Sequence, residues 1–199
     1  GGDTSGRYIV PDSGGSPAKH QPDRTIACHR STRARARLTR YRRFMRRNWS
    51  DTVDLQGDVA EPTSAAAVSD LVRAHPQALA LGSAHSFSTV AVTPGVHVET
   101  AHLPREVLIA GSTATVGAGM TYADVGAILR DNGVALAAMA SLPHITVGGA
   151  IATGTHGSGD HIGTLSSAVT GLQIVTADGD IRWIRRETDA DFAGWVVSL

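Results

Sequence analysis

Hydrophobic and polar positions repeat with a helical period in two stretches of the chain. Ala67, Val68, Leu71 and Val72 recur at helical spacing after Thr63-Ser64, either of which can serve as the N-cap. This helix is expected to end at His75-Pro76, because the residue before a proline avoids helical geometry. The spacing also predicts a helix over about 121–131, with an apolar face and a glycine just past its end: Tyr122, Val125, Ile128, Leu129 and Gly133.

Short apolar runs between these helices predict strands at 78–81, 96–98, 107–109 and 114–116. Residues 169–177 and 181–184 flank Asp178-Gly179, a pair that suits the tight turn of a β-hairpin. A last helix is expected to begin within 189–195. Helices and strands therefore interleave at short spacing, which indicates the α+β class.

The first 47 residues differ in character from the rest. They hold twelve basic and three acidic residues, so they carry a net charge of +9, whereas residues 48–199 carry −9. No sustained hydrophobic period runs through them, and Gly, Ser, Pro and Arg dominate. We expect residues 1–47 to be a disordered, Arg-rich extension and residues 48–199 to be the folded domain. A basic arm for nucleic acid or an anionic membrane is the alternative, but aromatic residues for base stacking are limited to Tyr41 and Phe44.

Cysteine use and hydropathy exclude several classes of protein. The single cysteine, Cys28, rules out an internal disulfide framework and a four-cysteine zinc site. No apolar run reaches the roughly 18–20 residues of a membrane-spanning helix, and residues 1–15 lack the apolar stretch of a secretory signal. A soluble, cytoplasmic protein with no membrane partner is the expectation.

Two loops rich in small residues are candidates for ligand binding. The first, Gly82-Ser83-Ala84-His85-Ser86-Phe87-Ser88, directly follows a predicted strand. The second, residues 141–159, contains five glycines and five serines or threonines. Small residues let backbone N–H groups approach a phosphate or a flat polar ligand closely. Turns use the same residues, but each loop also contains histidine, which turns do not require.

Both loops resemble one family of flavoenzymes. The resemblance rests on Leu81 to Phe87, on Met139-Ala140-Ser141-Leu142-Pro143-His144, on Ala152 to Gly159 and on Val175 to Gly179. From about residue 48 to residue 199 the chain resembles the PCMH-type FAD-binding half of the vanillyl-alcohol-oxidase superfamily. Bacterial alditol (xylitol) oxidases and the related aldonolactone oxidases are the most similar members. The resemblance implies an α+β FAD-binding domain of two small subdomains, here truncated at the C-terminus before the substrate domain.

The resemblance also implies roles for individual residues. In relatives the first loop wraps the FAD pyrophosphate, and the histidine at the position of His85 is bonded covalently to the flavin 8α-methyl group. A histidine that only hydrogen-bonds phosphate is the alternative. Ser141 would lie beside the isoalloxazine near the substrate hydroxyl. The predicted FAD contacts are Gly82, Ser83, Ala84, His85, Ser86, Phe87, Ser88, Ser141, Thr146, Gly149, Ala152, Thr153, Gly154, Thr155 and His156.

One position departs from the family pattern. Relatives have Gly-x-Gly-His-Ser, whereas Ala84 occupies the second glycine position here. If this position requires a positive φ, the alanine strains the loop by about 1 kcal/mol or more. If the glycine only provides room, the added methyl group is tolerated.

Metal and protease chemistry are weaker interpretations of the histidines. His144, His156 and His161 are spaced by 12 and 5 residues, which matches no standard zinc pattern. The sequence Gly154-Thr155-His156-Gly157 has no accompanying Gly-x-Ser-x-Gly motif for a nucleophile. No metal is predicted, and structural or solvent-facing roles are favoured for His144 and His161.

The resemblance implies an FAD-dependent oxidase of a polyol or sugar-derived alcohol, with hydride transfer to the flavin and O2 reduced to H2O2. The family's substrate-polarising groups come mainly from a domain beyond residue 199, so no catalytic base is predicted and this chain alone is expected to be inactive. The alternatives are a catalytically silent FAD-binding fragment or pseudoenzyme and, more distantly, a basic nucleic-acid-binding protein.

Overall fold

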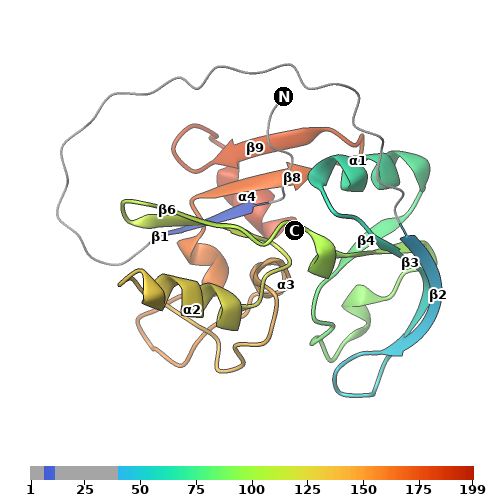
Figure 1. Ribbon diagram of the computed structural model, residues 1–199, viewed down its shortest axis with the longest axis horizontal. Helices are drawn as coiled ribbons and strands as arrows, with labels where there is room; N and C mark the ends of the chain where they lie inside the picture. The colour runs from blue at the N-terminus through green and yellow to red at the C-terminus, as the bar shows by residue number, and fades with distance from the viewer. Residues whose placement is uncertain (1–6, 12–39) are drawn as a thin grey trace.

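The computed structural model describes residues 7–11 and 40–199, with side chains from residue 46 onward. Figure 1 shows two sheets side by side, each with its own helices. The larger sheet has five strands in the order β6-β7-β1-β8-β9, and the smaller sheet has four in the order β2-β3-β5-β4. The expected division into two small α+β subdomains is confirmed.

The larger sheet is antiparallel at every pairing of its strands. These strands are β1 (Arg7–Pro11), β6 (Val107–Ala110), β7 (Thr113–Gly117), β8 (Gly171–Val175) and β9 (Ile181–Arg185). Three helices belong to this half, namely α2 (Tyr122–Asp131), α3 (Val147–Ala152) and α4 (Phe192–Val197). A 3-10 turn, η3 (Leu165–Ala168), lies beside α3.

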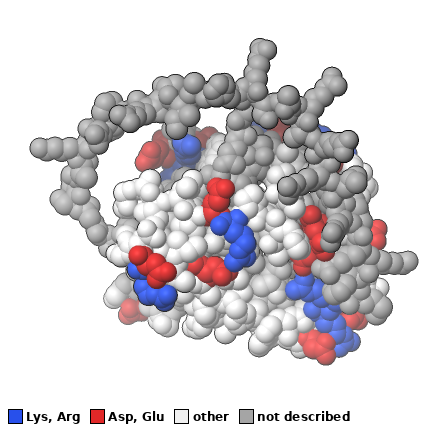
Figure 2. Space-filling model, in the orientation of Figure 1, with Lys and Arg blue, Asp and Glu red and all other residues white. Residues whose placement is uncertain are grey.

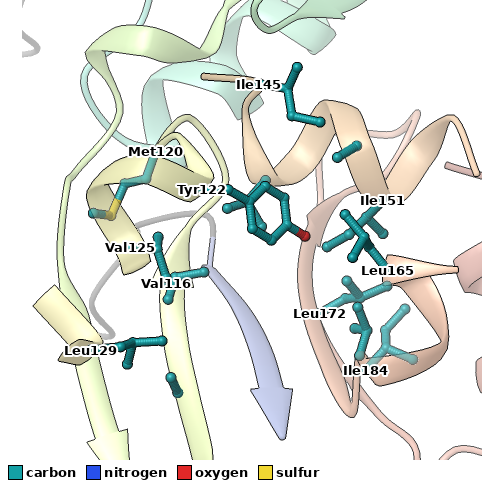
Figure 3. Close-up of a cluster of buried hydrophobic side chains, with 14 of the residues drawn as sticks. Val116, Met120, Tyr122, Val125, Leu129, Ile145, Ile151, Leu165, Leu172 and Ile184 are labelled. Atoms are coloured by element: carbon teal, nitrogen blue, oxygen red, sulfur yellow. The ribbon is translucent and has the colours of Figure 1, made fainter. Parts of the chain in front are cut away.

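One continuous hydrophobic core joins the helices to this sheet. It contains Val116 of β7, Val125 of α2, Ile151 of α3 and Leu172 of β8, all of them buried. Figure 3 shows these side chains converging from the different elements. The core is therefore built from residues far apart in the sequence and closes only when the whole larger subdomain is formed.

The smaller sheet combines parallel and antiparallel pairing. Its strands are β2 (Arg40–Arg47), β3 (Asp54–Glu61), β4 (Ala78–Leu81) and β5 (Val96–Glu99), with β5 parallel to both β3 and β4. Helix α1 (Ala65–Ala74) connects β3 to β4, and the 3-10 turns η1 (Thr89–Ala91) and η2 (Thr100–His102) flank β5. Two small clusters form the core here: one of Ala60, Leu71, Val96 and Val98, the other of Leu55, Leu81 and Ala84.

The predicted helices α1 and α2 begin where their capping residues place them. Ser64 is the N-cap of α1, and its side chain accepts a hydrogen bond from the Ala67 N–H at 3.1 Å. Thr121 and Asp124 form a capping box at the start of α2. The hydrogen bond from the Thr121 hydroxyl, with the nearby Arg105, holds the pKa of Asp124 below its ordinary value. Gly133 lies past the end of α2 with a φ of 73°, as expected for a glycine after a helix.

The remaining predictions differ in detail. The hairpin forms, but β8 spans 171–175 rather than 169–177, because the Thr176 backbone N–H and hydroxyl both donate to the Asp180 carbonyl and so begin the turn. The last helix begins at Phe192, since the Asp189 carboxylate instead accepts from the backbone N–H of Arg185 at 2.7 Å. Strand β3 and the short helix α3 were not predicted.

Helix α1 of the smaller subdomain docks on the β8–β9 turn of the larger one. The Ser69 hydroxyl donates to the Gly179 carbonyl oxygen at 2.6 Å. Arg73 donates to the Asp178 carbonyl at 3.2 Å and lies 3.5 Å from the Asp180 carboxylate. Polar contacts thus fix the two halves relative to each other at this point.

Strands β1 and β2 fall within residues 1–47, for which the sequence predicts a disordered extension. β1 pairs with β7 and β8 in the larger sheet, and β2 pairs with β3 in the smaller one. For residues 1–6 and 12–39 the prediction lies outside the described residues, as does Cys28. The domain boundary at residue 48 remains a prediction.

Charged side chains of the described residues lie in groups of mixed sign on the face that Figure 2 shows. Oppositely charged side chains also form ion pairs, such as Arg47–Asp54 and Arg105–Asp124, each at 2.8 Å. Within the described residues, no helix is both long enough and apolar enough to cross a membrane.

Candidate functional site

The loop that contains His85 begins where β4 ends. Leu81 is the last residue of β4 and is buried, and the chain then turns away from the sheet at Gly82. A Cβ atom at Gly82 would overlap the hydroxyl of Thr146. The Thr146 backbone N–H in turn donates to the Ser83 hydroxyl oxygen at 3.3 Å. The two loops predicted to bind FAD therefore meet here, and only glycine fits at the point of contact.

Ala84 adopts a left-handed backbone conformation, which was one of the two possibilities for this departure from the family pattern. Its φ is 54°, so the alanine occupies a backbone region that favours glycine. Its methyl group is buried with Leu55 and Leu81. Of the two interpretations of this substitution, the strained one is correct, and the strain is about 1–2 kcal/mol.

A short segment before β3 holds the strained loop in place. The backbone N–H of Trp49 donates to the Ala84 carbonyl at 2.8 Å, and the side-chain amide of Asn48 donates to the Ser86 carbonyl at 2.9 Å. The side-chain oxygen Oδ1 of Asn48 accepts from the backbone N–H groups of Thr52 and Val53 at 2.9 and 3.0 Å. Because Asn48 is 6 % exposed, these bonds form largely away from water. From the sequence, Asn48-Trp49 is only the predicted start of the folded domain, and these hydrogen bonds to the His85 loop were not predicted.

Two aromatic rings, those of Trp49 and His144, contact the His85 ring, and a third, Phe87, contacts Trp49. The Trp49 ring stacks on the His85 ring with centroids 4.4 Å apart and planes at 22°. Nε2 of His85 also lies 2.6 Å from Nε2 of His144, with the ring centroids 4.6 Å apart, and the His144 ring is itself 6.5 Å from the Trp49 ring. Phe87 meets the edge of Trp49 and is 68 % exposed. His144, for which a structural or solvent-facing role was predicted, is exposed and is also a direct partner of His85.

The surroundings of the His85 ring favour its neutral form. Partial burial, together with the neighbouring His144, lowers the pKa of His85 below its ordinary value of 6.5. A neutral imidazole has one nitrogen with a free lone pair, which is the form required of a nucleophile. The ring is therefore suited to bond formation at neutral pH.

The Thr146 hydroxyl is a buried polar group without a protein partner. Its Oγ1 atom is inaccessible to solvent and makes no hydrogen bond to the described residues. It lies beneath Gly82, and a Cβ atom built at Gly149 would come within 2.9 Å of it. A buried hydroxyl left unpaired costs about 1–3 kcal/mol, so such groups commonly mark a ligand or a functional constraint.

The last part of the second predicted loop, from Thr153 onward, follows α3. The Thr153 hydroxyl donates to the Gly149 carbonyl at 2.8 Å, and Gly154 takes a φ of 66°. Nδ1 of His156 lies 2.8 Å from the Gly157 carbonyl oxygen. These hydrogen bonds are local, and Ser141, Ala152 and His156 are exposed. Their roles toward FAD stay predictions, as do those of Ser86, Phe87, Ser88 and Thr155.

Side chains close enough to share a metal ion occur elsewhere, at the smaller sheet. Among the described residues these are Glu61, Glu99 and His102, whose ligand atoms lie within 4.8 Å of one another. Glu99 is already ion-paired with Arg46 at 3.0 Å. His161 is almost fully exposed, in line with the role predicted for it.

Comparison with known proteins agrees with this geometry. The family model of an FAD-binding domain matches residues 58–185, a range that includes both candidate loops. An alditol oxidase from a Streptomyces species is 38% identical over 138 residues, covering 66% of this chain and 33% of that protein. The mouse L-gulonolactone oxidase is 27% identical and covers 76% of this chain and 36% of its own length.

A solved structure supports the fold independently. Cholesterol oxidase from Brevibacterium sterolicum superimposes with a TM-score of 0.67 at 19% identity, covering 74% of this chain and 33% of that one. The chain spans about a third of the length of these relatives. The matched range covers most of the described domain, and the chain belongs to the family of FAD-binding domains.

Proposed function

We propose that this chain holds FAD between its two loops and serves as the flavin domain of an oxidase of polyols or sugar-derived alcohols. The observation that carries the proposal is the FAD-binding family match across residues 58–185, which contain the contact of Gly82 with Thr146. When bound, FAD supplies the two-electron acceptor for a hydride and is reoxidised by O2 with formation of H2O2. The cytoplasmic location expected from the sequence remains a prediction.

The residues at the contact between the loops fit a cofactor with phosphate groups. Gly82 and Gly149 leave the backbone exposed to close approach, and Ser83 adds a hydroxyl beside them. The Thr146 hydroxyl is buried beneath Gly82 and has no acceptor among the described residues, so its hydrogen bond is available to a phosphate oxygen once the two loops part enough to admit the cofactor. The remaining predicted residues of the second loop would extend this surface along the cofactor.

His85 is the residue proposed to bond the flavin covalently. Its lowered pKa favours the neutral ring, which is stacked on Trp49 and contacts His144, so its direction is set before the cofactor arrives. Fixing the nucleophile in this way lowers the entropic part of the barrier to bond formation. A histidyl link would also keep the flavin from dissociating and tune its electronics.

Titration of the purified chain with FAD tests cofactor binding. Gly82→Ala should weaken binding at least 10-fold, because the new methyl group displaces Thr146. Gly126→Ala is the matched control: a Cβ there meets only the Met139 side chain at 3.8 Å, so affinity should not change. Equal affinities in the two variants would contradict the assignment of Gly82 to the cofactor site.

Denaturing precipitation tests the covalent bond. Yellow colour should stay with the precipitated chain and be lost to the supernatant in His85→Ala. Peroxide formation with xylitol, sorbitol and an aldonolactone then distinguishes an active oxidase from an FAD-binding chain without turnover. Retained flavin with no peroxide would favour the second.

A further inference from the structure

We propose that Trp49 is the residue that positions His85 for covalent attachment to the flavin. The inference rests on the proposed covalent bond and assigns what sets the direction of its nucleophile. Trp49 acts through His85, so it is a positioning residue and neither makes nor breaks a bond itself.

The Trp49 ring contacts side chains of both candidate loops. It lies nearly parallel to the His85 ring, with centroids 4.4 Å apart and planes at 22°. It also meets the Phe87 ring edge to face at 6.3 Å and lies 6.5 Å from the His144 ring. Trp49 is 59% exposed and belongs to none of the three hydrophobic clusters found among the described residues. Its side chain therefore adds little to the cores, and its three ring contacts all lie at the candidate site.

A strained turn holds the backbone of Trp49 against the first loop. The backbone N–H of Trp49 donates to the Ala84 carbonyl at 2.8 Å, and the backbone N–H of Asp51 donates to the Asn48 carbonyl at 3.0 Å. Asp51 has a φ of 58° and Ala84 a φ of 54°, and these are the two non-glycine residues with positive φ in the part of the chain that the structure describes. Strain of this kind persists where the surroundings fix the backbone, commonly at a functional site. Both strained residues lie where the Trp49 turn meets the His85 loop.

Stacking on Trp49 fixes the plane of the His85 ring. The torsion that rotates an imidazole about its Cβ–Cγ bond has broad minima, so the loop backbone alone leaves the ring free to turn. A flat ring lying parallel to it restricts that rotation. Trp49 also covers one face of the imidazole, and partial burial is the main cause that lowers the pKa of His85. One side chain thus contributes to both the direction and the protonation of the nucleophile.

Bond formation at His85 depends on that direction. A C–N bond forms between a ring nitrogen of His85 and the 8α carbon, while one C–H bond of that methyl group and the N–H bond of the neutral imidazole break. The two protons pass to solvent, and two electrons pass through the flavin to O2, which takes up two protons and becomes H2O2. Because a displacement of about 1 Å can slow such a step roughly 100-fold, loss of the stack should appear in the rate.

Three substitutions of Trp49 separate the flat ring from the burial it provides. Trp49→Phe keeps an aromatic ring that can stack on His85. Trp49→Leu keeps apolar cover without a flat ring, and Trp49→Ala removes both. Trp183→Ala is the matched control, because it removes a tryptophan that is 40% exposed and lies in β9, outside both loops.

The first measurement is the rate at which saturating FAD becomes covalently bound to the full apo chain, followed by fluorescence of the denatured protein and by its mass. Trp49→Ala and Trp49→Leu should lower this rate by about 10- to 100-fold, the range for a misplaced reacting group. Reversible FAD affinity and melting temperature should change little, since the Trp49 side chain lies outside the cores. Trp49→Phe and Trp183→Ala should attach FAD at close to the unmodified rate.

The second measurement is an NMR titration of His85 in the apo chain, which a purely structural role of Trp49 would not move. The pKa of His85 should rise toward its ordinary value of 6.5 in Trp49→Ala, because the ring loses its cover, and should stay lowered in Trp49→Phe. In Trp49→Leu the pKa should change less than in Trp49→Ala. Slow attachment in Trp49→Leu would then report the lost orientation of the ring.

Each contrary outcome overturns a distinct statement. Attachment by Trp49→Ala at the unmodified rate would overturn the proposal, and so would equally slow attachment by Trp49→Phe. A slow rate accompanied by a matching loss of FAD affinity or melting temperature would show a structural role and would also overturn it. If the unmodified chain binds FAD reversibly and forms no adduct, the covalent attachment is wrong, and this inference falls with it while FAD binding stands. If the unmodified chain binds no FAD, the proposed function itself is wrong.

Discussion

The two halves of the molecule differ in how their hydrophobic cores are built. The larger subdomain has one continuous core drawn from β7, α2, α3, β8, β9 and α4. The smaller one has two separate clusters and buries polar groups such as His97 and Glu99 at 1% and 7% exposure. Yet the smaller half carries the His85 loop, its strained Ala84 and its Asn48-Trp49 clamp. The half with the continuous core therefore supports a half whose His85 loop contains backbone strain at Ala84.

Truncating a side chain in the larger core should give the largest loss of stability. Leu172 is fully buried in β8, so Leu172→Ala should lower the free energy of unfolding by about 2–5 kcal/mol. Leu55→Ala in the smaller cluster should cost less, because fewer side chains surround the cavity, but it should also weaken FAD binding, since Leu55 packs against Leu81 and Ala84. Urea unfolding and FAD titration measure both effects. A reversed order of stability would show that the two halves do not differ as their cores indicate.

Removing the clamp tests how the smaller half holds its loop. Asn48→Ala should cost about 2–3 kcal/mol, because the N–H groups of Thr52 and Val53 and the Ser86 carbonyl all lose their partner. Asn132→Ala is the matched control: its amide bonds only the Ile128 carbonyl at the exposed end of α2. Covalent flavin attachment should slow in the first variant and not in the second. Similar losses of stability in both would contradict the clamp.

Local patterns were enough to predict much of this fold. The caps of α1 and α2 and the glycine after α2 each depend on residues close together in the sequence. All three are present in the structure. Strand β3 was not predicted, since Asp54, Gln56, Gly57 and Asp58 interrupt its apolar positions. Helix α3 was missed because Gly148-Gly149 suits a loop better than a helix, and packing of Val147 and Ile151 into the core overrides that preference.

The candidate site was predictable only in part, for a physical reason. The loop motif identified Gly82 and His85, which are neighbours in sequence. The partner of His85 is 59 residues away, and the spacing of residues along a chain does not specify such a meeting. The Asn48 clamp carried one usable signal: an asparagine followed by Ser50 and Thr52, a composition typical of turns closed by side-chain hydrogen bonds.

Thr146→Val should move stability and affinity in opposite directions. The apo chain should gain about 1 kcal/mol, because an unpaired buried hydroxyl is replaced by a methyl group of similar shape. FAD affinity should fall by about 10- to 100-fold, the equivalent of a hydrogen bond to a charged group. Thr146→Ser, which keeps the hydroxyl, should bind FAD nearly as well as the unmodified chain. A Thr146→Val variant that binds FAD normally would show that the hydroxyl points away from the cofactor.

Restoring the family's glycine at residue 84 should have the smallest effect, because several contributions nearly cancel. Ala84→Gly relieves a left-handed alanine, which favours the variant by about 1–2 kcal/mol. It also loses a buried methyl group packed against Leu55 and Leu81, at about 0.8 kcal/mol, and adds about 0.5–1 kcal/mol of chain entropy to the unfolded state. The net change should stay within about 1 kcal/mol, while Ala84→Val should be clearly destabilising, since a β-branched residue is poorly tolerated at this φ. Thermal melts of the unmodified chain, Ala84→Gly and Ala84→Val measure these changes in stability. If Ala84→Gly lost more stability than Ala84→Val, packing of the side chain would outweigh the backbone strain, and the smaller cluster would be a stronger core than the comparison of the two halves allows.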